Sequence, residues 1–201
     1  MMHSIIVEVD AYKKKIHGYD PQKASRYHIK SGKLADEAFK QALKDPKYKK
    51  VILMCGGSAS GKSELVSSAL MQKSAIVYDG TLSSVEGAKV KIRNSEKRKK
   101  KVYVYAVFPK DIAESFRAFL VRDRVVPVKV FIETHSSSRE TLLWLLEQRI
   151  DIPVKIYESF VSKNKLQIKE FIFKSQLKLK HFVKNIQLSE EEVEKLIQIQ
   201  P

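Results

Sequence analysis

The stretch VILMCGGSASGKSELV, residues 51–66, decides the fold. VILMC at its start is apolar and partly β-branched, which is typical of a strand buried in a parallel sheet. GGSASGKS, residues 56–63, then fits the spacing G-x-x-x-x-G-K-[ST] of a phosphate-binding loop. Helical spacing follows in SELVSSALMQ. Because such a loop lies between a strand and a helix, the sequence predicts one here.

A loop of this kind directs backbone N–H groups and a helix N-terminus at the phosphates of a nucleotide. Lys62 would reach the β- and γ-phosphate oxygens, and the Ser63 hydroxyl would ligate magnesium. The expected cofactors are therefore Mg²⁺ and a nucleotide, either ATP or GTP. The predicted nucleotide contacts are Gly56, Gly57, Ser58, Ala59, Ser60, Gly61, Lys62, Ser63 and Glu64.

Composition limits the class of protein. The chain has 201 residues, 43% of them hydrophobic, which suits one domain with appendages. No apolar stretch approaches the ~20 residues of a membrane-spanning helix, and the first residues lack the pattern of a secretory signal. The single cysteine, Cys55, allows no internal disulfide and is expected to be a buried, inert thiol at a strand end. We therefore expect a cytoplasmic protein without a membrane partner.

The net charge of +15, from 38 basic and 23 acidic residues, raises nucleic acid as a partner. A protein that handles polyphosphates also benefits from a positive field, and no recognised nucleic-acid-reading module accompanies the lysines. Nucleic acid is therefore kept as an alternative and not favoured. The basic runs lie at 13–15, 47–50, 97–101 and along 164–184.

Strands that alternate with helices predict an α/β fold of the P-loop NTPase type, a parallel sheet flanked by helices, with helical N- and C-terminal additions. Residues 1–50 are predicted as a helical extension, 51–160 as the kinase core and 161–201 as a basic helical segment. Ser84 is expected to cap one helix, and SEEE at 189–192 predicts a capping box for another. The strands predicted after the phosphate loop cover 74–80, 102–108 and, as the last one, 154–160; helices are predicted over about 111–120 and 128–149.

Polar residues follow the predicted strands at the sheet edge where the crevice of a parallel sheet lies. Asp79 directly follows the apolar run AIVY and is expected near magnesium or the acceptor hydroxyl. Thr81 would donate a hydrogen bond to a substrate oxygen. Arg122 and Arg124 in the predicted loop 121–127 would neutralise charge on the transferred phosphoryl group. If the loop is extended, side chains two residues apart point to the same side, so Arg122 and Arg124 could bind the same anion. Other arginines considered for this role are Arg117 and Arg139.

The segment ETHSSSRE, residues 133–140, is expected at the same edge. His135 within it is a candidate base, but a lone histidine near a helix start more often caps or packs, so we assign it no catalytic role. Asp79 has an alternative interpretation as well, an ordinary turn aspartate before glycine.

These residues, in this order, resemble the zeta toxin family of P-loop kinases over roughly residues 20–160. The resemblance implies a kinase that phosphorylates UDP-N-acetylsugars with ATP or GTP, poisons cell-wall synthesis and is inhibited by a small helical antitoxin. The features that carry it are His28 and Ser31 before LADEAFKQAL, the loop GGSASGKS, the strand ending YDGT, VYVYAVFPKD, R-V-V-P at 124–127 and the helix before VKIYES.

The resemblance also implies roles for single residues. Lys62 and Ser63 would bind the nucleotide phosphates and magnesium. Asp79 stands where the family has a substrate-contacting glutamate, and Thr81 where it has a threonine that contacts the sugar nucleotide. Arg124 matches a lid arginine; Arg122 is a looser match, because the family's first arginine lies on the preceding helix.

The chain departs from the family between the phosphate loop and YDGT. Family members have there a further strand and helices with the aspartate thought to act as catalytic base. Only residues 67–77 separate the short helix from YDGT here, so we expect that element to be missing. Either Asp79 acts as base, or the chain binds nucleotide without efficient transfer.

Three hypotheses follow. The first is a zeta-toxin-like kinase that transfers the γ-phosphate to a hydroxyl of a small metabolite, UDP-N-acetylglucosamine by analogy, within a toxin–antitoxin system. The second is a polynucleotide or RNA kinase. The third is a degenerate nucleotide-binding module whose protein partner matters more than any reaction.

Overall fold

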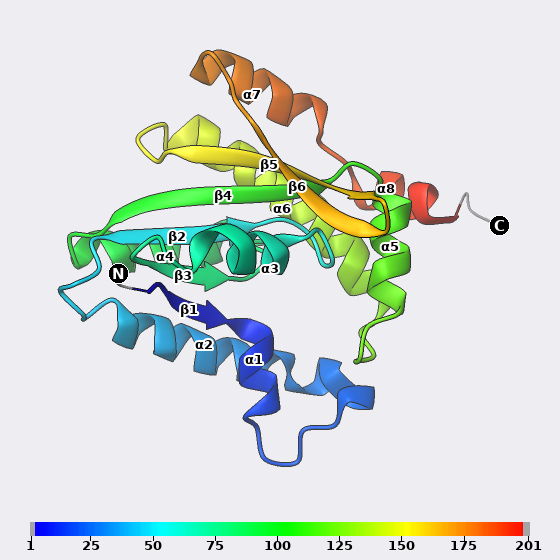
Figure 1. The fold of residues 1–201 in the computed structure, drawn as a ribbon, viewed down its shortest axis with the longest axis horizontal. Coiled ribbons are helices and arrows are strands. Elements are labelled where there is room, and N and C mark those ends of the chain that lie inside the picture. Colours follow the sequence, from blue (N-terminus) through cyan, green and yellow to red (C-terminus); the bar gives the residue numbers. More distant parts are fainter. Residues whose placement is uncertain (1–2, 199–201) are drawn as a thin grey trace.

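A computed structural model describes residues 3–198 of the chain. The described strands form one six-stranded sheet in the order β1-β3-β2-β4-β5-β6, in which only β6 is antiparallel to its neighbour (Figure 1). The strands are β1 (Ile5–Glu8), β2 (Lys50–Cys55), β3 (Ala75–Asp79), β4 (Lys101–Pro109), β5 (Val154–Ser162) and β6 (Lys165–Phe171).

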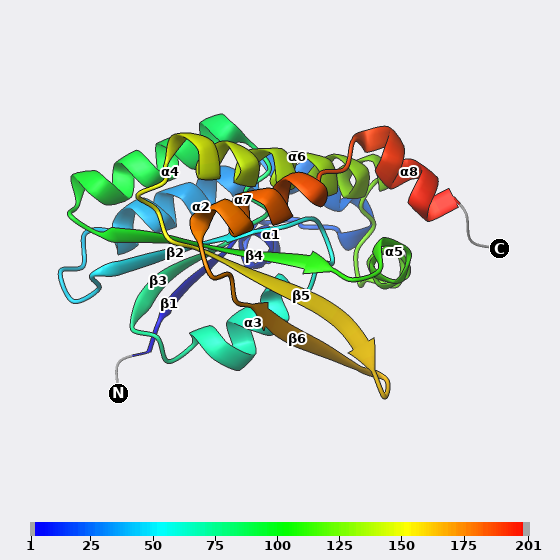
Figure 2. The same ribbon diagram turned by 90° about the horizontal axis from the view of Figure 1, so that it is seen from above.

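Helices cover both faces of this sheet, which confirms the predicted α/β fold. Helices α2, α4, α6 and α7 lie on one face, and the short α3 lies on the other (Figure 2). The helices are α1 (Val9–Lys14), α2 (His28–Ala42), α3 (Lys62–Leu65), α4 (Val85–Lys97), α5 (Ile112–Leu120), α6 (Val128–Gln148), α7 (Gln176–Asn185) and α8 (Glu190–Gln198). A 3₁₀ helix, Pro21–Tyr27, precedes α2, and a π-helical turn, Val66–Leu70, continues α3.

Predicted helix starts are confirmed by their caps. The Ser84 hydroxyl accepts a hydrogen bond from the N–H of Gly87 at the start of α4. The capping box of α8 is reciprocal, since the Ser189 N–H donates to the Glu192 carboxylate and the Glu192 N–H donates to the Ser189 hydroxyl. Cys55 is fully buried at the end of β2, as expected.

The prediction that the first fifty residues are helical was wrong for Ile5–Glu8, which form the edge strand β1. This strand pairs in parallel with β3 and places Glu8 opposite Asp79. Four residues are too few to show a strand's alternation, so the run IIVE cannot be told from the helical pattern that follows it. The sheet therefore has an edge strand beyond β3, supplied by chain that precedes the phosphate loop.

The prediction of helix from about Lys163 onward was also wrong at its start. Residues Lys165–Phe171 form β6, which makes an antiparallel hairpin with β5, so that 154–160 is not the last strand. Lys163 and Asn164 both have positive φ, which fits a two-residue hairpin turn. Helices α7 and α8 follow, as predicted for the rest of this segment. No helix in residues 3–198 is long and apolar enough to cross a membrane.

Candidate nucleotide-binding site

The phosphate loop, residues 56–63, connects β2 to α3 as predicted, and its glycines are required by geometry. Gly56 and Gly61 have φ of 134° and 87°, in the region that favours glycine. A Cβ on Gly56 would lie 2.2 Å from the Val107 carbonyl oxygen, and one on Gly61 would lie 2.9 Å from Cβ of Ser159. The backbone of β4 therefore leaves no room for a side chain at Gly56, and the Ser159 side chain of β5 leaves none at Gly61.

Lys62 lies across this loop and is buried. Its Nζ donates to the carbonyl oxygens of Gly56 at 2.9 Å and Gly57 at 2.6 Å, and it lies 3.4 Å from the Ser60 hydroxyl. Burial lowers the pKa of Lys62 to about 8, against the opposing charge of Asp79. Anionic phosphates would compensate for the lost hydration of this ammonium group.

Helix α6 holds the loop from the other side. Thr134 Oγ1 accepts from the Ser58 N–H at 3.0 Å, and His135 Nε2 lies 2.9 Å from the Ser58 carbonyl oxygen. Burial lowers the pKa of His135 to about 3, so the ring is neutral. A neutral ring that donates Nε2–H to a carbonyl is a packing group, in agreement with the role assigned from the sequence. The segment 133–140 therefore takes part in the site through the contacts of Thr134 and His135 to the phosphate loop.

Ser63 and Asp79 form the part of the site that suits a metal ion. The Ser63 hydroxyl donates to the Asp79 carboxylate at 3.1 Å. Both are hard oxygen ligands, and Mg²⁺ at a nucleotide site takes one or two such groups together with phosphates and water. Burial raises the pKa of Asp79, although Lys62 and the Ser63 hydrogen bond oppose that shift. Residues 3–198 contain no cluster of three or more His, Cys, Asp or Glu arranged to hold a metal.

The arginine loop, residues 121–127, joins α5 to α6. Its exposure alternates, with Arg122 and Arg124 both turned inward, as predicted for an extended segment. Arg124 forms an ion pair with Asp10, and its buried Nε has no hydrogen-bond partner. The Arg122 guanidinium lies over the Phe119 ring, 5.5 Å from its centre.

The two other arginines do not reach the same place. Arg117 lies on α5 and is exposed. Arg139 is buried on α6, where NH1 donates to the His135 carbonyl oxygen at 2.6 Å and the guanidinium lies over Phe108.

A cavity of about 710 Å³ brings these groups together at the carboxyl ends of β1, β2 and β3. Of the predicted site residues, Ser58, Ala59, Lys62, Ser63, Asp79, Thr81, Arg122 and Arg124 line it, whereas Gly56, Gly57, Ser60, Gly61 and Glu64 do not. The hydroxyl oxygens of Thr81 and Ser83 lie 2.9 Å apart and form a hydrogen bond with each other.

The cavity also has a wall that sequence reasoning missed. Glu8 comes from the end of β1, Asp10 and Lys13 come from α1, and His28 comes from α2. Burial and the nearby charge of Asp79 raise the pKa of Glu8. The one signal in the sequence was the pair of carboxylates in EVD directly after the β-branched run IIV.

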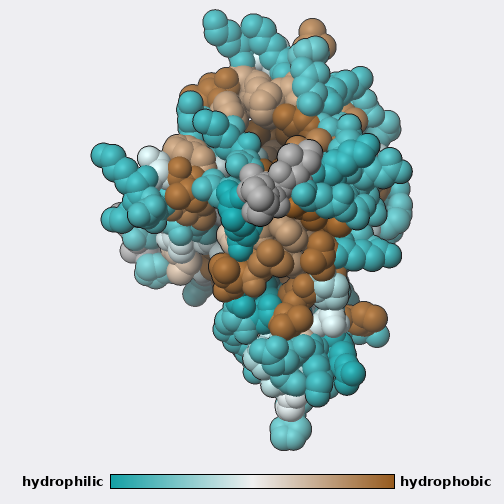
Figure 3. Space-filling view, turned by 90° about the vertical axis from the view of Figure 1, so that its right-hand side faces the viewer, coloured by the Kyte–Doolittle hydropathy of each residue, from teal (hydrophilic) through white to brown (hydrophobic). Residues whose placement is uncertain are grey.

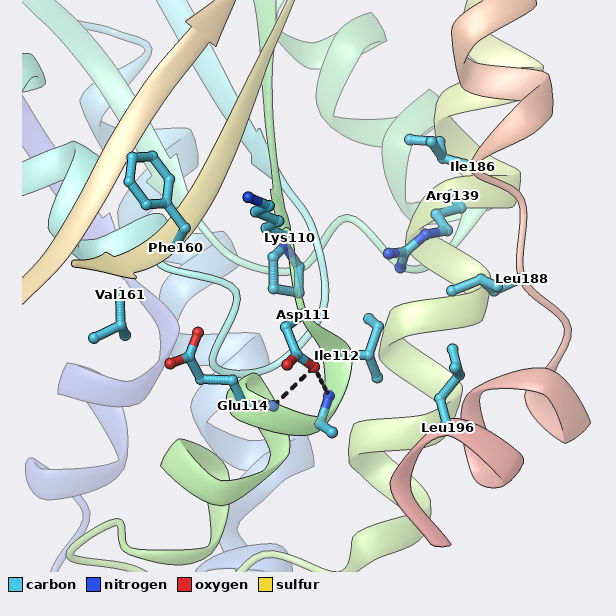
Figure 4. Close-up of a pocket in the computed structure, with 12 residues that line it drawn as sticks. Lys110, Asp111, Ile112, Glu114, Arg139, Phe160, Val161, Ile186, Leu188 and Leu196 are labelled. Carbon is cyan, nitrogen blue, oxygen red and sulfur yellow. Dashed lines mark hydrogen bonds between the residues drawn. The ribbon is translucent and has the colours of Figure 1, made fainter. Parts of the chain in front are cut away.

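A second hollow of about 680 Å³ lies between the start of α5, the end of β5, α6 and α8, and it shares no lining residue with the first (Figure 4). Asp111 in its floor caps α5 by accepting from the N–H groups of Ala113 and Glu114. Phe160, Val161, Ile186, Leu188 and Leu196 give it apolar walls. Figure 3 shows that apolar side chains gather in the middle of this side of the molecule, bordered by hydrophilic ones.

The parallel sheet, the phosphate loop between β2 and α3, and the cavity at the carboxyl ends of the strands define an α/β protein with a P-loop NTPase fold. The sequence matches no protein-family model and no curated protein. Among solved structures, a chain from the crystal structure of AvrRxo1-ORF1:-ORF2 with ATP aligns with a TM-score of 0.54 and 13% identity, over 85% of this chain and 75% of that one.

Two further chains come from crystal structures of the AvrRxo1-ORF1:AvrRxo1-ORF2 complex, one with sulphate ions and one described as native. Their TM-scores are 0.49 and 0.48 at 11% identity, over 90% of this chain and 85% of theirs. At identities this low, the similarity to the first chain establishes a shared fold.

Proposed function

We propose that this protein is a kinase that transfers the γ-phosphoryl group of ATP or GTP to a hydroxyl of a small metabolite. The observation that carries the proposal is the convergence of Lys62, the Ser63–Asp79 pair and the arginine loop on one cavity. Phosphoryl transfer requires positioning and neutralisation of charge on the transferred group, and these are the groups that supply both.

Each group has a distinct task in this proposal. Lys62 and the loop N–H groups bind the β- and γ-phosphates. Ser63 and Asp79 would hold Mg²⁺, which when bound would neutralise charge that develops on the phosphates. Arg122 and Arg124 approach from the arginine loop and bind the transferred group. The wall formed by β1, α1 and α2 is left for the acceptor, since the phosphate loop forms another part of the cavity lining.

The resemblance to zeta toxins makes UDP-N-acetylglucosamine the first acceptor to try, and it suggests that the kinase acts as a toxin with a helical protein partner. The shared fold with a chain crystallised in a two-protein complex with ATP supports the nucleotide and the partner in this proposal. Expression of the protein in a bacterial host should then arrest growth, and Lys62→Ala should relieve the arrest.

The decisive experiment follows label from γ-labelled ATP or GTP, with magnesium, into a panel of acceptors. The panel contains UDP-N-acetylglucosamine, nucleosides and a 5′-hydroxyl oligonucleotide. We expect transfer to a small acceptor that Lys62→Ala abolishes, while Lys73→Ala, an exposed lysine outside the cavity, has no effect. Labelling of the oligonucleotide alone would support a polynucleotide kinase. Nucleotide binding without any transfer would contradict the kinase and indicate a binding module.

A further inference from the structure

The acceptor side of the cavity is built by the amino-terminal strand. Strand β1 pairs with β3 so that Glu8 is level with Asp79, and the chain then turns into α1 through Val9 and Asp10. The carboxyl ends of adjacent parallel strands meet at one edge of a sheet. Strand β3 and the first turn of α1 therefore deliver carboxylates to the same cavity, Asp79 next to the phosphate loop and Asp10 just beyond the end of β1.

These two carboxylates have different partners. Asp79 accepts from Ser63, the residue that the phosphate loop offers to magnesium. Asp10 is bound by cations only, Lys13 at 3.0 Å and Arg124 from the arginine loop. Burial would raise the pKa of Asp10, but Lys13 and Arg124 outweigh it and hold the pKa below its usual value, so the group is ionised.

Arg124 is also poised to change partner. Its side chain is 15% exposed, and its Nε is buried without a hydrogen-bond partner. A guanidinium with an unused donor, lining the same cavity as the phosphate loop, is suited to a phosphate oxygen. If Arg124 turns to the γ-phosphate, the Asp10 carboxylate loses one of its two cations and is left facing the cavity.

We propose that Asp10 is the catalytic base of this kinase and that Arg124 covers it until a nucleoside triphosphate binds. The inference rests on the proposed function and assigns Asp79 to the metal. In the reaction, the acceptor O–H proton passes to the Asp10 carboxylate and the acceptor oxygen forms a bond to the γ-phosphorus. The bond from the γ-phosphorus to the β–γ bridging oxygen breaks, and its electron pair leaves with the nucleoside diphosphate.

The test is the isosteric substitution Asp10→Asn, assayed with the panel acceptor that wild type labels best. We expect kcat to fall by about 10²–10⁴-fold, the usual contribution of a positioned base. Binding of a fluorescent, non-hydrolysable ATP analogue should be unchanged or tighter, because Arg124 is no longer held by a carboxylate. Asp79→Asn should differ by weakening the magnesium-dependent binding of the analogue.

Two further variants control for loss of structure. Asp10→Glu keeps the charge for Lys13 and Arg124 but moves the carboxylate, and a displacement of about 1 Å is enough to cost ~10²-fold in rate. Glu37→Gln removes an exposed carboxylate of α2 that pairs with Lys40 outside the cavity, and it should leave kcat unchanged.

The outcomes are distinct. Transfer by wild type and full activity of Asp10→Asn would overturn the assignment of the base while the kinase stands. Loss of analogue binding in Asp10→Asn would also overturn it, by placing Asp10 on the nucleotide side. An inactive wild type that still binds the analogue would overturn the proposed function and, with it, this inference.

Discussion

Gly57 of the phosphate loop packs directly against the His135 ring of α6. A Cβ on Gly57 would lie 2.3 Å from carbon atoms of the imidazole ring, which is fully buried on α6. We expect Gly57→Ala to destabilise the protein by about 1–3 kcal/mol, the usual cost of overpacking. Removing the ring relieves the clash, so Gly57→Ala with His135→Ala should cost less than the sum of the single changes.

Urea denaturation of the wild type, the two single variants and the double variant measures this coupling. Additive changes in unfolding free energy would contradict it, because the two side chains would then act independently. The motif G-x-x-x-x-G-K-[ST] allows any residue at position 57. The requirement for glycine there comes from the His135 ring on α6, which leaves no room for a side chain.

The buried ammonium of Lys62 should make nucleotide binding depend on pH. Its pKa is lowered to about 8, chiefly by burial, whereas bound phosphates would keep it protonated. The complex then holds more protons than the free protein above that pH, so binding must weaken as pH rises. We expect a constant affinity below about pH 8 and a loss of about tenfold per pH unit above it.

Titration with an ATP analogue from about pH 7 to about pH 9.5 measures this slope. Lys62→Met should bind more weakly and lose the slope, while Lys110→Met, outside the cavity, should keep it. A slope retained in Lys62→Met would assign the titration to another group.

At the residue scale, the part of the site that could be predicted is the part that is local in sequence. The motif fixes Lys62 and Ser63, and an acidic residue at a strand end identified Asp79. Asp10 was missed because its place in the cavity depends on which strand β1 pairs with, a fact of tertiary structure that no local pattern carries. The ion pair between Asp10 and Arg124 likewise joins residues at distant positions in the sequence.

At the scale of elements, β1 contributes to the hydrophobic core of the protein. Val7 in this strand is 1% exposed and packs in the core cluster that also contains Phe39 of α2 and Tyr78 of β3. Val7→Ala should therefore lower the unfolding free energy by about 1–3 kcal/mol, in line with other deletions of buried methyl groups.

Chemical denaturation checks this value, with Ile29→Ala as the control. Ile29 lies on α2 of the same segment but is 74% exposed, so its loss should cost less than about 0.5 kcal/mol. Equal, negligible effects of both changes would mean that the amino-terminal segment packs loosely, as an appended helical extension would.

Long or strongly marked elements were predicted correctly and short ones at the edges were not. Strand β4 is nearly all β-branched or aromatic, and α6 has a long apolar face, so each was evident without its neighbours. In β6, KLQIKEF carries exposed lysines that protect a sheet edge, and this polarity resembles a basic helix when read alone. Edge strands gain their stability from pairing, which composition does not report.

At the scale of the whole molecule, the charge of +15 is dispersed. The basic runs lie on α1, before β2, between α4 and β4, and along β6 and α7, so they extend from one edge of the sheet to the other. Within the cavity, by contrast, Lys13, Lys62, Arg122 and Arg124 face Glu8, Asp10 and Asp79. A cavity of mixed charge suits a small phosphorylated acceptor with hydroxyl groups better than the uniform backbone of a nucleic acid.

This distribution leads to a prediction about salt. A nucleic acid bound through six to ten phosphate contacts to lysines and arginines loses about 10³–10⁵ in affinity between about 50 mM and about 200 mM salt, because counterions are no longer released so favourably. A small acceptor held by a few groups inside the cavity should lose about tenfold or less over the same range, since partly buried charge pairs are screened little.

The measurement is kcat/KM for the best acceptor at the two salt concentrations, with the ATP concentration saturating. A shallow dependence is expected if the dispersed lysines only surround the site. A steep dependence that Lys178→Gln and Lys180→Gln reduce, both on α7 and outside the cavity, would instead mean that the basic surface binds the acceptor, and the polynucleotide kinase would replace the small-molecule kinase.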